Sequence, residues 1–124
     1  MNIEFFTTPA GTLSCTAGGK RLHSAYNPIK EAQVFAQKAE CDFNPSFVIV
    51  TGPALSYCAP FLKSRFSHSK VGAIHYSTAF SDSDKEWDFV FYLSDNDLEL
   101  SQKLFNFMGE EGLSSCLFLS WQPS

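Results

Sequence analysis

Short apolar runs alternate with longer amphipathic stretches over the second two thirds of the chain. The amphipathic stretches, from about 55 to 65 and from 95 to 112, predict helices, and the second begins with an acidic turn that suits the helix dipole. Continuous apolar runs are typical of strands that are buried on both faces of a parallel sheet. The run "FVIVT" (47–51) is of this kind. Three further strands are predicted at "KVGAIHY" (70–76), "WDFVFYL" (87–93) and "CLFLSW" (116–121).

The first part of the chain has a different pattern. The β-prone runs "IEFFTT" (3–8) and "TLSCTA" (12–17) are separated by a Pro-Ala-Gly turn, and "KRLHS" (20–24) could form a third short strand. Asn27-Pro28 then opens a helix, with Asn at the N-cap and Pro at the first position. Apolar residues follow at helical spacing: Ile29, Ala32, Phe35, Ala36 and Ala39.

Strands that alternate with helices predict an α/β fold with right-handed crossovers. We expect a Rossmann-like three-layer sandwich with a mainly parallel sheet, preceded by a small N-terminal β unit. The chain is one domain over 1–124, with the β unit at 1–26 and the Rossmann-like unit at 27–124. No helix follows the last strand to cover it. We therefore expect the natural protein to continue past Ser124, and the alternative is that a long loop or a partner covers the sheet.

Composition narrows the classes of function. The chain has a net charge of −4 and scattered basic residues, which argues against nucleic acid as a partner. Its start is not a secretory signal, and no apolar run reaches the roughly 18 residues of a membrane span, so we expect a cytoplasmic protein. The four cysteines form no C-x-x-C pair and the three histidines show no ligand spacing with them, so no metal site is predicted. Thirteen phenylalanines indicate an aromatic core or a surface that a partner covers.

The turn "TGPALSY" (51–57) follows a predicted strand and precedes a predicted helix, which is where phosphate-binding turns occur. Of the glycines in a dinucleotide fingerprint only Gly52 remains, while Ala54 and Ser56 stand where further glycines would ease the approach of a ligand. Pro53 also removes one backbone N–H. A nucleotide could still bind, with Ser56 offering its hydroxyl. The sequence favours a tight structural turn without a ligand.

The segment "HYSTAFSDSD" (75–84) comes at the carboxyl end of the second predicted strand, where open α/β sheets bind ligands. Thr78 and the residues before it could hydrogen-bond a base or sugar, and Asp82 and Asp84 could hold Mg²⁺. We favour a solvated polar loop for the two aspartates, and a structural hydrogen bond for His75 over a role as general base. The candidate nucleotide-binding residues are thus Gly52, Pro53, Ala54, Leu55, Ser56, His75, Tyr76 and Ser77. Catalytic residues and a cofactor stay unassigned, and Walker A and G-x-S-x-G motifs do not occur.

The segment "LHSAYNPIKEA" (22–32) precedes and opens the first predicted helix. Read from its residues alone, Ser24 and Asn27 cap the helix and Tyr26 packs beside it as a hydrophobic staple.

This segment also resembles the N-terminal region of the motility-associated-factor glycosyltransferases, bacterial proteins related to the 6-hydroxymethylpterin diphosphokinase-like family. That region reads approximately L-H-S-x-Y-x-P-x-x-E-A, then a strand and G-x-G-x-G-Y. The second motif matches at Gly52 and Tyr57, with Ala54 and Ser56 in place of glycines. The resemblance covers roughly residues 20–121. The first motif matches at Leu22, His23, Ser24, Tyr26, Pro28, Glu31 and Ala32.

The resemblance implies a cytoplasmic enzyme that transfers a nonulosonic sugar from a CMP-activated donor to flagellin. It also implies that catalysis lies in a following Rossmann-like domain with a G-x-G-P-S-L turn. "TGPAL" (51–55) is similar to that turn too, but the upstream motif favours the N-terminal domain. On this interpretation the chain alone is inactive and serves assembly or substrate binding, with flagellin or the missing C-terminal domain as partner. Two alternatives stay open: a stand-alone nucleotide-binding enzyme, and a protein-interaction module that could form a homo-oligomer.

Overall fold

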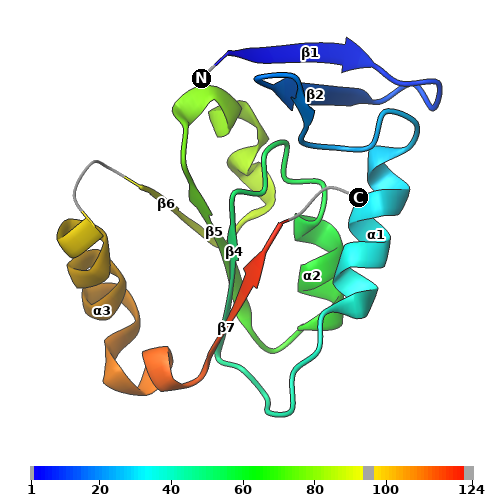
Figure 1. Ribbon diagram of the computed structural model, residues 1–124. Coiled ribbons are helices and arrows are strands. Elements are labelled where there is room, and N and C mark those ends of the chain that lie inside the picture. Colours follow the sequence, from blue (N-terminus) through cyan, green and yellow to red (C-terminus); the bar gives the residue numbers. More distant parts are fainter. Residues whose placement is uncertain (1, 94–96, 122–124) are drawn as a thin grey trace.

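The computed structural model describes residues 2–93 and 97–121. Two sheets and three α-helices build the fold (Figure 1). In chain order the elements are β1 (Ile3–Thr7), β2 (Leu13–Ala17), β3 (Lys20–Arg21), α1 (Pro28–Lys38), β4 (Phe47–Thr51), α2 (Ala59–Arg65), β5 (Lys70–His75), the 3₁₀ helix η1 (Thr78–Glu86), β6 (Phe89–Tyr92), α3 (Asp97–Ser114) and β7 (Cys116–Ser120).

The main sheet has the strand order β6-β5-β4-β7, and all three pairings are parallel. Helices α1 and α2 lie on one face of this sheet and α3 lies on the other (Figure 1). The predicted α/β fold with a parallel sheet is therefore confirmed. After β4 the chain adds β5 and β6 on one side of that strand and then returns to add β7 on its other side. The direction in which strands are added therefore reverses between β4 and β7. Open α/β sheets bind their ligands at such a switch point, outside the carboxyl ends of the strands.

Two apolar layers hold the sheet between its helices. On the face of α1 and α2, Val48 and Val50 of β4 are fully buried against Ala32 and Leu62. On the α3 face, Ile49 of β4 packs with residues of β5 and α3. A strand places alternate side chains on opposite faces, so a central strand must be apolar at every position. This requirement explains why the run "FVIVT" marks β4 so clearly.

The predicted β unit forms a separate antiparallel sheet in the order β1-β2-β3. It lies across the end of the molecule where β4 and β5 finish (Figure 1). Cys15 of β2 is fully buried there against Ala54, which follows β4, and Phe80 of η1. The small sheet thus covers the carboxyl ends of the parallel strands, where a ligand site was predicted.

Local signals placed α1 correctly. Asn27 is the N-cap, its side chain accepts a hydrogen bond of 3.1 Å from the Lys30 N–H, and Pro28 takes the first position. The start of α2 was predicted near Leu55, but the helix begins at Ala59. Asp82 and Asp84 were expected in a polar loop, but both lie in η1.

Among the described residues no helix combines the length and the apolar character needed to span a membrane.

Candidate functional site

A small pocket lies at the carboxyl ends of β4 and β5, under the N-terminal sheet. Its volume is about 80 Å³. It contains five of the eight candidate residues, because adjacent parallel strands end at the same edge of the sheet. Pro53, Leu55 and Ser56 do not line it. The lining residues are Gly52, Ala54, His75, Tyr76 and Ser77, together with Leu22 and Phe80.

The turn after β4 has three residues in the left-handed region, and only the first of them is a glycine. Gly52, Ala54 and Ser56 have φ angles of 61°, 50° and 63°, all in the left-handed region. These are the three glycine positions of the G-x-G-x-G-Y pattern. A side chain in this region costs about 1–3 kcal/mol. Ala54 and Ser56 therefore keep a strained conformation that other contacts must stabilise.

Both replacing side chains make internal contacts. The Ser56 hydroxyl accepts a hydrogen bond of 2.8 Å from the indole N–H of Trp87, and both residues are buried. The Ala54 methyl group packs between Cys15 and Phe80. The Ser56 hydroxyl is therefore already bonded within the protein, and Ala54 is packed in a buried cluster that leaves only the small pocket beside the turn.

His23 binds the turn at the backbone. The Leu55 N–H donates a hydrogen bond of 2.9 Å to Nε2 of His23, whose side chain is 1% exposed. In a phosphate-binding turn, backbone N–H groups of this kind face the anion. Here an imidazole nitrogen of the same chain is the acceptor.

This contact requires a neutral His23, because Nε2 can accept a hydrogen bond only when it carries no proton. The other ring nitrogen, Nδ1, is buried without a hydrogen-bond partner in the described part of the chain, and it lies 3.9 Å from Oε1 of Glu31. Burial lowers the pKa of His23 to about 4. The carboxylate of Glu31 would favour a charged imidazole, but loss of hydration is the larger effect.

Ser24 anchors the chain that carries His23. Its hydroxyl accepts hydrogen bonds from the N–H groups of Tyr26 and Asn27, and its own N–H donates a 2.7 Å bond to Glu31. The predicted capping role of Asn27 is confirmed. The Ser24 hydroxyl bonds N–H groups that precede the helix, so it shapes the turn before α1 and does not cap the helix itself. The predicted staple is wrong, because the Tyr26 side chain is 71% exposed.

A polar network that extends from buried His75 to partly exposed Tyr92 joins the pocket to η1. His75 is 1% exposed, and its Nε2 donates a 2.6 Å hydrogen bond to Oδ1 of Asp84. The Tyr92 hydroxyl donates a 2.5 Å bond to the other oxygen of the same carboxylate. The hydrogen bond to Asp84 raises the pKa of Tyr92 to about 12, with a smaller contribution from burial. Asp84 is thus an internal acceptor and not the solvated loop residue that the sequence favoured.

The preference for a structural hydrogen bond at His75 agrees with this geometry. A histidine held by a carboxylate is also a suitable general base for a molecule that reaches it.

Tyr92 was not among the candidate residues. Its neighbours in the sequence do not distinguish it from the other aromatic residues of the predicted strands. Clusters of three or more potential metal ligands do not occur in the described ranges. Asp82 and Asp84 are therefore not part of such a cluster.

The size of the pocket limits what it can bind. Pockets for cofactors and drug-sized ligands are typically about 300–1,000 Å³, and the pocket beside His75 is about 80 Å³. A nucleotide does not fit in this conformation.

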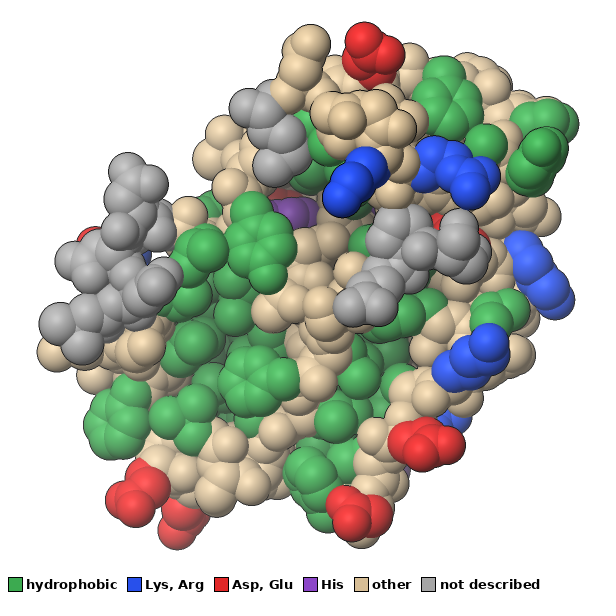
Figure 2. All heavy atoms as spheres, in the orientation of Figure 1, with side chains coloured by type: hydrophobic (Ala, Val, Ile, Leu, Met, Phe, Trp, Pro, Cys, Tyr) green, Lys and Arg blue, Asp and Glu red, His purple; other side chains and the backbone are tan. Residues whose placement is uncertain are grey.

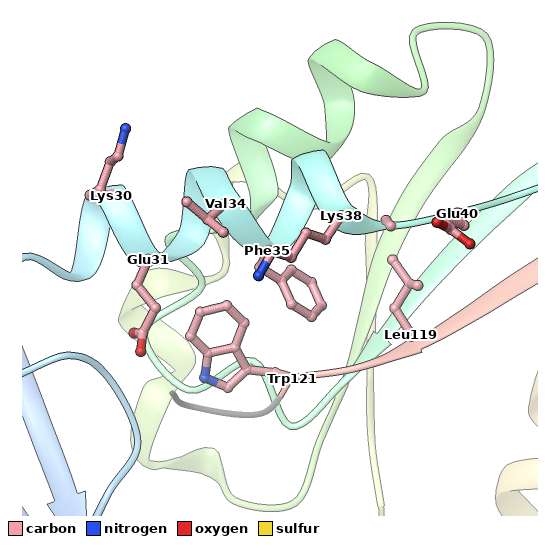
Figure 3. A pocket seen from close by; sticks show the side chains of 9 residues that line it. Lys30, Glu31, Val34, Phe35, Lys38, Glu40, Leu119 and Trp121 are labelled. Carbon is pink, nitrogen blue, oxygen red and sulfur yellow. The ribbon is translucent and has the colours of Figure 1, made fainter.

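A larger groove of about 450 Å³ runs between α1 and β7 and includes Phe35, Leu119 and Trp121 (Figure 3). None of its residues was a candidate from the sequence.

Changing Gly52 to alanine is expected to lower the free energy of unfolding by about 2 kcal/mol. Its φ of +61° disfavours any side chain, and an added Cβ would lie 2.9 Å from Cε2 of Tyr76. Gly18 is a matched control, since its φ is +56° and an added Cβ would meet nothing within 4 Å. Gly18→Ala should cost about 1 kcal/mol. Urea unfolding of both variants measures the difference, and equal losses would show that the Tyr76 contact contributes nothing.

Comparisons of the chain with models of protein families, with curated proteins and with solved structures find no match. The geometry of the site and the two sequence motifs are therefore the grounds on which a function can be proposed.

Proposed function

We propose that this chain is a non-catalytic, Rossmann-like domain of a motility-associated-factor-type glycosyltransferase and that it serves assembly or binding of the flagellin substrate. The bond between the Leu55 N–H and His23 carries the proposal. It joins His23 of the L-H-S-x-Y motif to the turn in which Ala54 and Ser56 stand in place of glycines. The two motifs that carry the resemblance therefore form one physical unit.

Other residues of the first motif have roles in the same unit. The Leu22 carbonyl accepts a 2.7 Å hydrogen bond from the indole of Trp121, and Glu31 binds the Ser24 N–H. Pro28 and Ala32 belong to the buried side of α1. These contacts give the motif a structural purpose that requires no nucleotide.

Tyr26 is the exception in this motif. Its ring is 71% exposed, and its backbone N–H makes the local bond to Ser24. An exposed aromatic ring is a common anchor in protein interfaces. Within the proposal, Tyr26 contributes to binding of the protein substrate.

A stand-alone nucleotide-binding enzyme is the second candidate, and the His75–Asp84 pair at the pocket favours it. Three observations weigh against it. The pocket is small, the Leu55 N–H is already bonded to His23, and the side chains of Ala54 and Ser56 make internal contacts. To bind a donor nucleotide, the protein would have to widen the pocket, release His23 from the Leu55 N–H and break the internal contacts of Ala54 and Ser56.

Thermal unfolding in the presence of nucleotides tests the proposal. CMP, a CMP-activated nonulosonic sugar, ATP and NAD, each at millimolar concentration, should leave Tm unchanged to within about 1 °C. A ligand at 100 times its Kd would stabilise the native state by about 2.7 kcal/mol and raise Tm by several degrees. In the same buffer, purified flagellin should bind saturably to the immobilised chain, and Tyr26→Ala should weaken that binding without changing Tm.

A saturable rise in Tm with any of these nucleotides would favour the enzyme instead, above all if Gly52→Ala abolished it. Failure of flagellin to bind, with no nucleotide effect, would remove the substrate-binding role.

A further inference from the structure

β7 has an open backbone edge. It pairs with β4 on one side and is the last strand of its sheet on the other. The Trp121 N–H donates to Thr51 and the Ser115 carbonyl accepts from Phe47, so the odd-numbered residues direct their backbone groups toward β4. In a parallel pair these groups alternate in direction along the strand. The N–H and C=O groups of Cys116, Phe118 and Ser120 therefore point outward.

The surface around this edge is apolar. Hydrophobic side chains gather on the face that presents β7, between α3 and α1 (Figure 2). Phe118 is 51% exposed on β7. On the other side of the strand, Phe35 and Trp121 lie side by side in the groove next to α1, with ring centroids 4.9 Å apart (Figure 3). Edge strands of monomeric proteins are usually protected by charges, proline or a bulge, and β7 reads "CLFLS".

We propose that a second copy of this chain binds at this edge, with the two β7 strands antiparallel about a two-fold axis at Phe118. Such pairing would join the two parallel sheets into one sheet. Phe118 would face Phe118 of the second copy, and Cys116 would face Ser120. Each of these positions has outward backbone groups, as the closely spaced hydrogen-bonded pairs of an antiparallel ladder require.

The side chains favour the same register. "LFL" (117–119) reads the same in both directions, so the two-fold axis places Leu117 opposite Leu119 of the second copy. These leucines lie on the face of α1, and Phe118 lies on the face of α3. The α1 face of one sheet therefore continues into the α1 face of the other, and the same holds for the α3 faces. Apolar side chains then pack against each other across the two-fold axis.

Charges beside the edge are complementary in this arrangement. Lys38 lines the groove together with Leu119, Asp42 lines a hollow together with Leu117, and Glu40 lies between them and lines both. Because Leu119 of one copy lies beside Leu117 of the other, Lys38 approaches the two acidic residues of the second copy, twice per dimer. None of these three side chains forms an ion pair within the described residues. A foreign strand would need to reproduce both the apolar pattern and the charges, so a second copy is the better fit.

Sedimentation equilibrium of the whole chain tests the proposal, which does not depend on the glycosyltransferase assignment. We expect a concentration-dependent mass that approaches twice 13.8 kDa. Phe118→Lys should abolish the dimer while leaving the circular dichroism spectrum unchanged. Phe105→Lys is the matched control, because Phe105 is 52% exposed but belongs to α3 and not to the edge strand. It should leave the dimer intact.

Charge reversal gives a second test that does not alter the strand. Lys38→Glu should raise the dimer Kd about tenfold or more, since it replaces two attractive contacts by two repulsive ones. Adding Glu40→Lys and Asp42→Lys to it should restore the dimer. A wild-type chain that is monomeric up to millimolar concentration would overturn the proposal, as would a dimer that neither Phe118→Lys nor Lys38→Glu weakens. A monomer that instead takes up a foreign strand at β7 would also overturn it.

Discussion

Replacing Trp121 by alanine is expected to lower the free energy of unfolding by about 3–5 kcal/mol, which is the cost of removing a large aromatic side chain from a core. Trp121 is 7% exposed and follows β7 directly. Its ring packs on Phe35 and on His23, and its indole N–H donates to the Leu22 carbonyl. The residue thus holds the segment before α1 against the end of the parallel sheet. Urea unfolding, followed by circular dichroism, measures the loss.

Trp121→Phe separates packing from hydrogen bonding. It keeps an aromatic ring but removes the donor to Leu22, so it should cost about 1–2 kcal/mol. Proteolysis should also cut near residues 22–26 faster in the alanine variant than in the phenylalanine variant. If Trp121→Ala stays within about 0.5 kcal/mol of the wild type, the proposed anchoring of this segment is wrong.

Acidification from pH 7 to pH 4 is expected to remove about 3 kcal/mol of stability through His23 alone. Its pKa falls from 6.5 to about 4 on folding because burial disfavours the charged ring. Between these values the unfolded chain binds the proton and the folded chain does not, so stability is complete above pH 6.5 and falls as the pH decreases toward 4. The difference between the two pKa values, at 1.36 kcal/mol per unit, corresponds to about 3 kcal/mol.

The contribution of His23 is measured as a difference between two pH profiles. His23→Gln keeps an acceptor for the Leu55 N–H but does not titrate, so its free energy of unfolding should fall less between pH 6.5 and 4. His68→Gln is the control, because it removes an exposed histidine far from this contact along the chain. Its profile should follow the wild type. Parallel profiles for His23→Gln and the wild type would mean that His23 titrates alike in the folded and unfolded states.

The central strands β4 and β5 could be located from the sequence because a strand buried on both faces must be apolar throughout. The edge strands β6 and β7 are also apolar in sequence, although they are only half-buried. "FVIVT" coincides with β4, and the other three runs contain β5, β6 and β7. The Asn27-Pro28 signal placed the start of α1, since capping depends only on local backbone chemistry. The start of α2 was misplaced by four residues. Ser56 looks helical by pattern, but its left-handed φ excludes it from an α-helix.

Part of the candidate site also followed from the sequence. Gly52 and His75 come at the ends of adjacent parallel strands, so their meeting in one pocket is a consequence of topology. The network of His75, Asp84 and Tyr92 could not be predicted. It depends on how η1 folds back over the pocket, and the polar composition of residues 78–86 carries no signal for that.

The sequence by itself determined the class of fold, the positions of the buried strands and the loss of glycines from the turn after β4. These properties depend on apolar periodicity and on local backbone preferences, and both are set by residues that are close together in the sequence. Only the tertiary structure decided what replaces a ligand at that turn. His23 is 32 positions away from Leu55 in the chain, and Trp87 is 31 positions away from Ser56. Contacts of this range are set by how the β unit and η1 pack on the sheet, which no local pattern encodes.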